Sequence, residues 1–408
     1  MPSKLYLIPN PNYQKSGIKS YIHLMRKYRI RPIKEGPYSI GHTIHQTGRP
    51  FSDKPVGGRA IFRQVIQKNL HNGQTEPVRA DDIQQDATCF LPVQIGTPPQ
   101  TVHLVPDTAS PDLWVRSSDL PRAEGHHFFD PSKSSTFKPT NRWPWEMLQL
   151  DGSSISGPIG IDKVALGDVT IQNREIKLAS KLSSEYDQFS GDGILGLSVH
   201  SASSDARGIA DGIWGQADLP PSGKFFTVKL GSWGPSKPFC SFGHIDQDVI
   251  ADCTGDIHYA KVDSTSGVWK FESASAVVGE KAIDRPMNAA MADISAPLTL
   301  LDDAICQAIY DAIPGAFYDS ECQGFIFPSN LSVDQRPCLQ LDIGGRVVAM
   351  PKENLAFAEA KPGYMYGGIQ SRGHGQLDIL GANFLEGVYA IFDISGDRFG
   401  IAQAKELK

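Results

Sequence analysis

From residue 89 onward, short apolar or alternating runs are separated by clusters of Gly, Pro, Asn, Asp and Ser. Closely spaced runs bounded by turn residues are typical of β-strands. They occur at 160–166, 169–171, 225–230, 347–350 and 388–392. The clearest helix is predicted over 304–313, immediately before Pro314. The pattern therefore predicts an all-β fold with few helices.

The first 80 residues differ from the rest in charge. They contain 14 Lys and Arg against 3 Asp and Glu, whereas the remainder contains 25 and 42. A basic segment of this kind can lie over an acidic body by Coulomb attraction. A nucleic-acid-binding arm is the alternative, but no aromatic or Gly-rich recognition pattern accompanies the charge, so we expect no nucleic-acid partner.

Within this basic segment, a helix is predicted over residues 16–28. Ser16 serves as its N-cap, and one face carries Ile18, Tyr21, Ile22 and Met25. Residues 49–87, which include Gly57-Gly58 and Gly73-Gln74, are expected to form a linker.

The body of the chain contains an internal repeat. Asp107 follows the apolar residues Val105-Pro106, and Asp293 follows Met291-Ala292 at a distance of 186 residues. An Ile-Leu-Gly segment begins 87 residues after Asp107, and another begins 86 residues after Asp293. Matched spacing predicts two related lobes that bring their two carboxylates together where they meet.

Several motifs in this order resemble the pepsin-like aspartic peptidases, in particular their fungal branch. They are VQIGTPPQ at 93–100, DLWV at 112–115, FDPSKSSTF at 129–137, DGILGL at 192–197 and LDILG at 377–381. The resemblance covers roughly residues 88 to 404. It implies a bilobal pepsin-like acid protease fold with an active-site cleft between the lobes. We expect an N-terminal lobe with inter-lobe strands over 88–270 and a C-terminal lobe over 271–408.

The resemblance extends to the basic segment, through Asn10-Pro11-Asn12-Tyr13 and Arg26-Lys27-Tyr28. In this family such a propeptide covers the cleft, with basic residues near the carboxylates, until acid releases it. Residues 1–87 are therefore expected to be a basic propeptide-like segment and linker, with a processing site near residues 80 to 88.

Asp107 and Asp293 match the two catalytic positions of the family. Two carboxylates that share one proton allow one to activate water as a general base while the other donates to the substrate carbonyl. The family pattern is Asp-Thr-Gly followed by Ser or Thr. Around Asp107 the supporting Thr108 and Ser110 are present, but Ala109 replaces Gly.

The surroundings of Asp293 depart further from the pattern. Ile294 replaces the hydroxyl residue, Ser295 stands in the place of Gly as a supporting residue, and Ala296 lacks the final hydroxyl. The flap, which covers the substrate cleft in the family, also differs because Gln149 replaces its Tyr; the neighbouring flap residues are Leu150, Asp151 and Gly152. Each lost hydrogen bond to a charged group costs roughly 1.5 to 3 kcal/mol. We therefore predict weak or absent proteolysis.

Three functions remain open. The first is an aspartic-type endopeptidase homologue with weakened or lost peptide hydrolysis. The second is a repurposed enzyme of small-molecule, secondary-metabolite biosynthesis that uses a carboxyl group for dehydration, isomerisation or cyclisation, favoured by the apolar Ile294, Leu150, Ala296 and Pro297. The third is a non-catalytic pseudoprotease that binds a peptide or ligand. We expect a monomer with a peptide or small molecule in its cleft.

Neither a cofactor nor a metal is predicted. CxxC and zinc-ligand spacings do not occur, and His126-His127 is interpreted as a solvated loop pair. Six cysteines allow 15 pairings, among which Cys306 with Cys322 is the best candidate disulfide.

The apolar runs are too short to span a bilayer, so no membrane partner is expected. The opening nine residues lack the apolar core of a secretory signal. An intracellular location follows from the sequence as it stands, and a secreted or vacuolar one if the family pattern holds.

Overall fold

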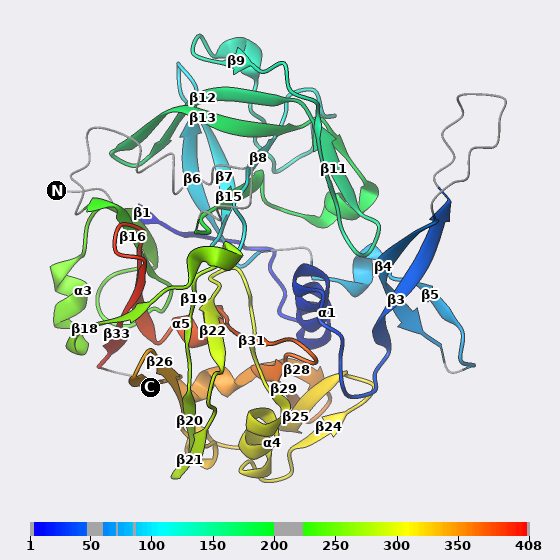
Figure 1. The fold of residues 1–408 in the computed structure, drawn as a ribbon, viewed down its shortest axis with the longest axis vertical. Helices are drawn as coiled ribbons and strands as arrows, with labels where there is room; N and C mark the ends of the chain where they lie inside the picture. Colours follow the sequence, from blue (N-terminus) through cyan, green and yellow to red (C-terminus); the bar gives the residue numbers. More distant parts are fainter. Residues whose placement is uncertain (1–3, 47–59, 71, 85–86, 200–222, 406–408) are drawn as a thin grey trace.

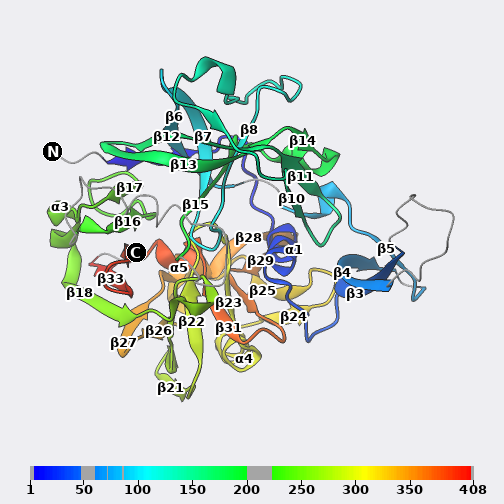
Figure 2. The same cartoon turned by 45° about the horizontal axis from the view of Figure 1, so that its top comes forward.

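The computed structural model describes residues 4–46, 60–70, 72–84, 87–199 and 223–405. Two β-rich lobes face each other, and helix α1 (Gly17–Tyr28) of the N-terminal segment lies between them (Figure 1). A view turned by 45° shows the same arrangement, with α1 beneath one lobe and above the strands of the other (Figure 2). The all-β, bilobal architecture predicted from the sequence is confirmed.

The first lobe is built on an eight-stranded sheet. Its strands, in spatial order, are β2 (Ile8–Pro9), β6 (Cys89–Ile95), β7 (Gln100–Asp107), β15 (Gly193–Gly196), β8 (Leu113–Arg116), β13 (Val169–Ala179), β12 (Ile159–Leu166) and β9 (Lys138–Pro139). A hairpin packs beside it, formed by β10 (Trp145–Leu148) and β11 (Ser154–Gly157), with β14 (Lys181–Leu182) alongside.

The second lobe contains three smaller sheets. The five-stranded one has the order β19 (Lys270–Glu272), β22 (Ala289–Ala292), β31 (Leu377–Leu380), β23 (Thr299–Leu301) and β30 (Ile369–Ser371). One four-stranded sheet has the order β21 (Lys281–Asp284), β20 (Ser275–Val278), β26 (Leu339–Ile343) and β27 (Arg346–Ala349). The other has the order β24 (Phe317–Asp319), β25 (Gly324–Pro328), β29 (Tyr364–Gly367) and β28 (Ala356–Lys361). The predicted helix is present as α4 (Asp303–Asp311), capped by Asp302, whose side chain accepts from the Ile305 N–H.

A six-stranded sheet combines strands from three distant parts of the chain. Its order is β1 (Leu5–Tyr6), β17 (Phe239–Phe242), β16 (Phe225–Lys229), β32 (Val388–Asp393), β33 (Arg398–Ala404) and β18 (Cys253–Lys261). Two short helices, α3 (Gln247–Ala251) and α5 (Ala382–Leu385), pack near it. The aromatic rings of Phe226 and Phe392 stack at 4.6 Å, and the indole N–H of Trp269 donates to the Leu197 carbonyl, so this core joins the two lobes.

Helix α1 forms where the apolar spacing predicts it, because Tyr21, Ile22 and Met25 are buried on one face. These side chains share an apolar cluster with Leu150 of the first lobe and Leu298 of the second. The helix therefore packs against both lobes at once.

The expected linker is partly wrong. A three-stranded sheet joins β3 (Tyr38–Gln46), β4 (Ala60–Asn69) and β5 (Thr75–Pro77), so part of residues 49–87 is ordered strand. β4 contains the β-branched residues Ile61, Val65 and Ile66, which favour a strand, but its apolar residues do not alternate with polar ones, so the sequence pattern did not reveal it. Residues 47–59, including Gly57-Gly58, lie outside the described residues.

In the described part of the chain, no helix combines the length and apolar character that crossing a membrane requires. All six cysteines lie among the described residues and are free thiols, so the expected Cys306–Cys322 disulfide is not formed. Cys306 is buried on α4 with its Sγ 3.7 Å from the Leu301 carbonyl oxygen, whereas Cys322 lies in the turn between β24 and β25. The large apolar core makes a cross-link unnecessary for folding.

Candidate active site

The two aspartates lie at the ends of matching strand pairs. Asp107 ends β7, which pairs in parallel with β15 so that Asp107 lies opposite Gly196. In the other lobe β22 pairs in parallel with β31, and the N–H of Asp293 donates to the Leu380 carbonyl at 3.0 Å. The internal repeat in the sequence therefore corresponds to one local structure used twice.

The glycine of each Ile-Leu-Gly segment is required by a close backbone approach. A Cβ on Gly196 would lie 2.4 Å from the Ser110 carbonyl oxygen, and one on Gly381 would lie 2.2 Å from that of Leu298. Only glycine lets the loop after each aspartate pack this tightly. The matched spacing read from the sequence thus has a steric cause.

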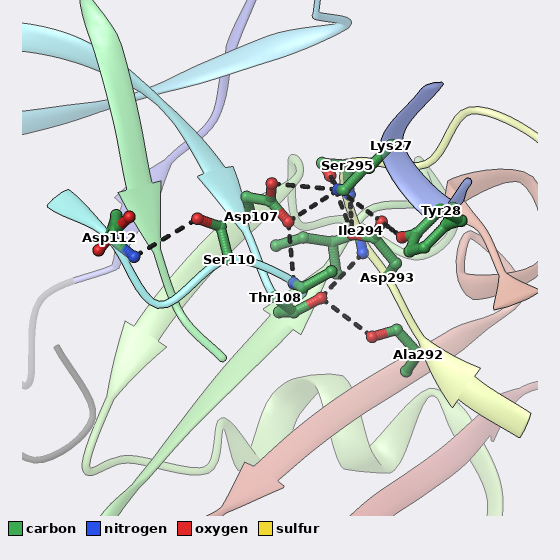
Figure 3. Close-up of polar contacts among 11 residues, drawn as sticks. Lys27, Tyr28, Asp107, Thr108, Ser110, Asp112, Ala292, Asp293, Ile294 and Ser295 are labelled. Atoms are coloured by element: carbon green, nitrogen blue, oxygen red, sulfur yellow. Dashed lines mark hydrogen bonds and ion pairs between the residues drawn. The ribbon is translucent and has the colours of Figure 1, made fainter. Parts of the chain in front are cut away.

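One ammonium group joins the two carboxylates. Lys27, near the end of α1, places its Nζ 2.9 Å from Oδ1 of Asp107 and 2.8 Å from Oδ2 of Asp293 (Figure 3). The same Nζ donates to the Ser295 hydroxyl at 2.6 Å, and the Tyr28 hydroxyl donates to Oδ2 of Asp293. Both predicted catalytic residues therefore lie within hydrogen-bond distance of a single atom.

Burial and charge act on the two acids with different results. Both are almost fully buried. Burial raises the pKa of Asp107, and the neighbouring Asp293 adds to this while Lys27 opposes it. Burial also acts to raise the pKa of Asp293, but the charge of Lys27 and the hydrogen bonds from Lys27 and Tyr28 outweigh it, so that pKa is lowered. One acid is thus favoured as the proton carrier and the other as the carboxylate.

The Thr108 hydroxyl connects the lobes. It donates to the Ala292 carbonyl at 3.0 Å and accepts from the Ile294 N–H at 3.1 Å. Ile294 occupies the equivalent position in the second lobe, and its apolar side chain is buried in the core, so the reciprocal pair of bonds cannot form. The hydrogen bonds from the first lobe to the second are therefore present, and the equivalent bonds from the second lobe to the first are not.

The two supporting serines differ in what they contact. The Ser295 hydroxyl and N–H both donate to Oδ1 of Asp293 at 2.9 Å. The Ser110 hydroxyl accepts instead from the Asp112 N–H at 3.4 Å, and Oδ1 of Asp107 accepts from the Ala109 N–H at 2.8 Å (Figure 3). Ser295 thus acts directly on its aspartate, whereas Ser110 braces the loop.

The predicted flap residues form the turn between β10 and β11. The Gly152 N–H donates to the Gln149 carbonyl, with Gly152 at a positive φ of 89°. Leu150 is buried in the α1 cluster, and its carbonyl accepts from the Ile66 N–H of β4.

The flap is also tied to the N-terminal segment by charge. Nη1 of Arg26 lies 2.8 Å from Oδ2 of Asp151, and both side chains are buried. Lys4, near the start of the segment, forms an ion pair with Asp246, the N-cap residue of α3. The sequence indicated that the basic segment could lie over the acidic body. These two ion pairs each join a basic residue of the segment to an acidic residue of the body.

Two carboxyl groups within reach of one ammonium group, with unlike proton affinities, are the groups required for general acid–base attack of water on a carbonyl. Strand pairing, the Thr108 contact between lobes and the flap define the structural class as a pepsin-like aspartic protease.

Comparison with known proteins agrees with this class. The family model for eukaryotic aspartyl protease matches residues 89–404. Aspergillopepsin-1 of Aspergillus pseudoglaucus is 34% identical over 331 residues, covering 80% of this chain and 82% of that protein. Aspergillopepsin-1 of Aspergillus fumigatus is 32% identical over 383 residues, covering 89% and 92%. The chain belongs to the eukaryotic aspartyl protease family, among relatives of the fungal aspergillopepsins.

Lys27 and Tyr28 were not among the predicted site residues, although the Arg26-Lys27-Tyr28 motif was part of the resemblance. Their signal was the excess positive charge of the segment, which indicates attraction to acids but does not select which ones. Only the end of α1, in contact with both lobes, brings Lys27 to the aspartates.

Proposed function

We propose that the chain is the precursor of an acid-acting aspartic endopeptidase of low turnover, in which residues 1–87 are an inhibitory segment whose helix α1 covers the two acids. The observation that carries this proposal is the Lys27 ammonium between Asp107 and Asp293. A side chain in that position prevents the two acids from holding an attacking water, so the chain in this state is inactive.

Acid would weaken this contact through Asp293. Its pKa is lowered in the folded chain, so its ionised form stabilises the docked segment above its ordinary pKa, and that contribution is lost as the pH falls through the lowered value. Asp107 acts in the opposite direction because its pKa is raised. Release therefore depends on protonation of the acid that binds both Lys27 and Tyr28.

The relatives support the precursor character. Alignment with the A. fumigatus protein covers 89% of this chain. Residues 88–408 alone make up less than four-fifths of this chain. The alignment therefore extends into the N-terminal segment. That relative is itself named as an aspergillopepsin.

Low turnover is expected from the altered surroundings of the acids. Ile294 has no hydroxyl to make the inter-lobe hydrogen bonds that Thr108 makes, and Gln149 occupies the position of the Tyr in the family's flap. Each 1.36 kcal/mol of lost transition-state stabilisation slows the reaction about tenfold. Two such losses would reduce hydrolysis by orders of magnitude while leaving the acid pair in place.

The experiment is cleavage of a mixed peptide library by the full chain between pH 3 and 7.5, read by mass spectrometry. We expect slow cleavage only below about pH 4, the ordinary pKa of Asp, because release requires protonation of Asp293, whose pKa is lowered; loss of the N-terminal segment should accompany it. Cleavage should disappear in Asp107→Asn and in Asp293→Asn, and should persist in Asp284→Asn, which changes an exposed acid outside the cleft. Cleavage by either dyad variant would contradict the proposal.

The same experiment separates the alternatives. A folded chain without cleavage at any pH would favour the repurposed enzyme or the pseudoprotease, and a requirement for Asp107 at neutral pH on a small molecule would select the former. The apolar residues that suggested the repurposed enzyme give it little support, because Ile294 and Ala296 are buried in the cores and Leu150 contacts the α1 cluster.

A further inference from the structure

Three histidines gather around a buried carboxylate in the first lobe. His103 lies on β7, His126 and His127 lie in the loop after β8, and Asp192 immediately precedes β15. Nδ1 of His127 is 3.0 Å from Oδ2 of Asp192, and the rings of His103 and His127 are 4.6 Å apart. Along the chain, His103 and Asp192 are far from the adjacent pair His126-His127, so the sequence alone did not bring the four residues together.

The carboxylate of Asp192 is held rigidly. Its Oδ2 accepts a hydrogen bond from the backbone N–H of His103 at 2.7 Å, and its Oδ1 accepts one from the backbone N–H of His127 at 2.8 Å. Its side chain is 1% exposed. An oriented carboxylate beside imidazole nitrogens is a set of ligands that zinc sites use.

The three side chains are close enough to bind one small transition-metal ion after a small rotation of a ring. One ligand atom each from His103, His127 and Asp192 lies within 4.8 Å of the other two. Zinc binds imidazole nitrogen and carboxylate oxygen at about 2.0–2.2 Å, which requires ligand atoms to approach one another more closely than this. His127 is about half exposed, so its ring has room for the necessary rotation.

We propose that His103, His127 and Asp192 form a zinc-binding site, with solvent in the fourth position. His126 lies beside it, with Nδ1 3.4 Å from Oδ1 of Asp192 and a side chain only 10% exposed. It is therefore not the solvated residue that the sequence suggested, and it supports the carboxylate from the opposite side.

The site is separate from the acid pair. His103 and Asp107 are on the same strand, and four residues of strand span about 13 Å. Because His103 lies on β7 and Asp192 adjoins β15, a bound ion would fasten together the two strands that position Asp107. We infer a structural role for the ion in the first lobe, with no part in the chemistry of the cleft.

The test is calorimetric titration of the chelator-treated full chain with Zn²⁺ at pH 7.5, where imidazole is neutral. We expect one ion per chain, and at least tenfold weaker binding in His103→Ala and in His127→Ala. His374→Ala, which removes an exposed histidine of the other lobe, should bind as the wild type does. Thermal unfolding without metal checks that each variant is folded; His127→Ala is the safer variant because its side chain is half exposed.

Cobalt provides a second readout. Co²⁺ in place of Zn²⁺ should give the visible absorption of a tetrahedral site in the wild type, and this should be lost in His127→Ala. Failure of the folded wild type to bind Zn²⁺, or equal affinity in the wild type and His127→Ala, would overturn the site. Neither result depends on peptide cleavage, so the outcome is independent of the proposed function.

Discussion

The two aspartate loops occupy equivalent places in the two lobes, yet they make different contacts. In the first, the Thr108 hydroxyl crosses to the other lobe and binds the backbone on both sides of Asp293. In the second, the apolar side chain of Ile294 makes no hydrogen bond to the first lobe, while Asp293 accepts hydrogen bonds from Ser295 and Tyr28. The first loop therefore joins the lobes, and the second binds the N-terminal segment more extensively.

This difference shows how a symmetric site can lose one element without losing its geometry. Thr108 alone satisfies the Ala292 carbonyl and the Ile294 N–H. Backbone pairing with β15 and β31 positions the acids independently of the missing hydroxyl. Substitutions should accordingly have unequal effects on the two loops.

The largest effect is expected for Lys27→Met, which acts on both loops. It leaves two buried carboxylates without their shared cation, and breaking a buried ion pair from one side costs about 3–5 kcal/mol. Urea unfolding of the full chain at pH 7 should show this loss of unfolding free energy. An added protease should also cut the N-terminal segment faster in the variant than in the wild type. Lys19→Met removes the same charge from the same helix and serves as the control; an equal loss there would mean that net charge, rather than the contact, is responsible.

Thr108→Val should break the contact that the first loop makes with the second lobe. The change keeps the shape of the side chain but leaves two buried backbone groups without a partner, at a cost of about 3 kcal/mol in unfolding free energy. Ile294→Val at the equivalent position should cost about 1 kcal/mol, because it deletes one methylene. Denaturant unfolding of both variants tests the asymmetry, and equal losses would show that the inter-lobe contact is unimportant.

Tyr28→Phe should affect only the second loop. Removing a hydrogen bond to a charged group costs about 2 kcal/mol, and it moves the pKa of Asp293 upward toward its ordinary value. The stabilisation that Asp293 provides is present at high pH and lost as the pH falls through its folded pKa, so the variant should release its segment at a higher pH than the wild type.

Mass spectrometry of the segment after incubation across pH 3 to 6 measures this shift. Tyr6→Phe changes a half-exposed residue of the same segment and should leave the pH of release unchanged. An unchanged release pH in Tyr28→Phe would show that the phenol does not govern Asp293.

The smallest effect compares the serines. Ser295→Ala removes a hydroxyl bonded to both Asp293 and Lys27 and should cost about 1 kcal/mol in the stability of the docked segment. Ser110→Ala should cost less, since its hydroxyl makes a longer bond to the Asp112 N–H. Urea unfolding of the full chain at pH 7 ranks the two, and the reverse order would contradict the division between the loops.

Sequence patterns predicted the repeat, α1, the strands and the candidate acids, because apolar periodicity and matched spacing follow directly from burial and strand pairing. They did not predict the contact of Ser110 with Asp112, which depends on a hydroxyl orientation within the loop. They also missed β4 and the histidine cluster. Both depend on which distant segments fold together, and local composition carries little information about that.

The short strands at the start of the chain have a consequence for how the protein is made. β1 pairs with β17 and β2 with β6, so the N-terminal segment supplies the outermost strand of two sheets. A chain synthesised without residues 1–87 would expose the backbone of both partner strands, and such open edges favour aggregation. The segment therefore completes the edges of two sheets in addition to contacting the two acids, and a chain that lacks it would have to cover both edges in another way.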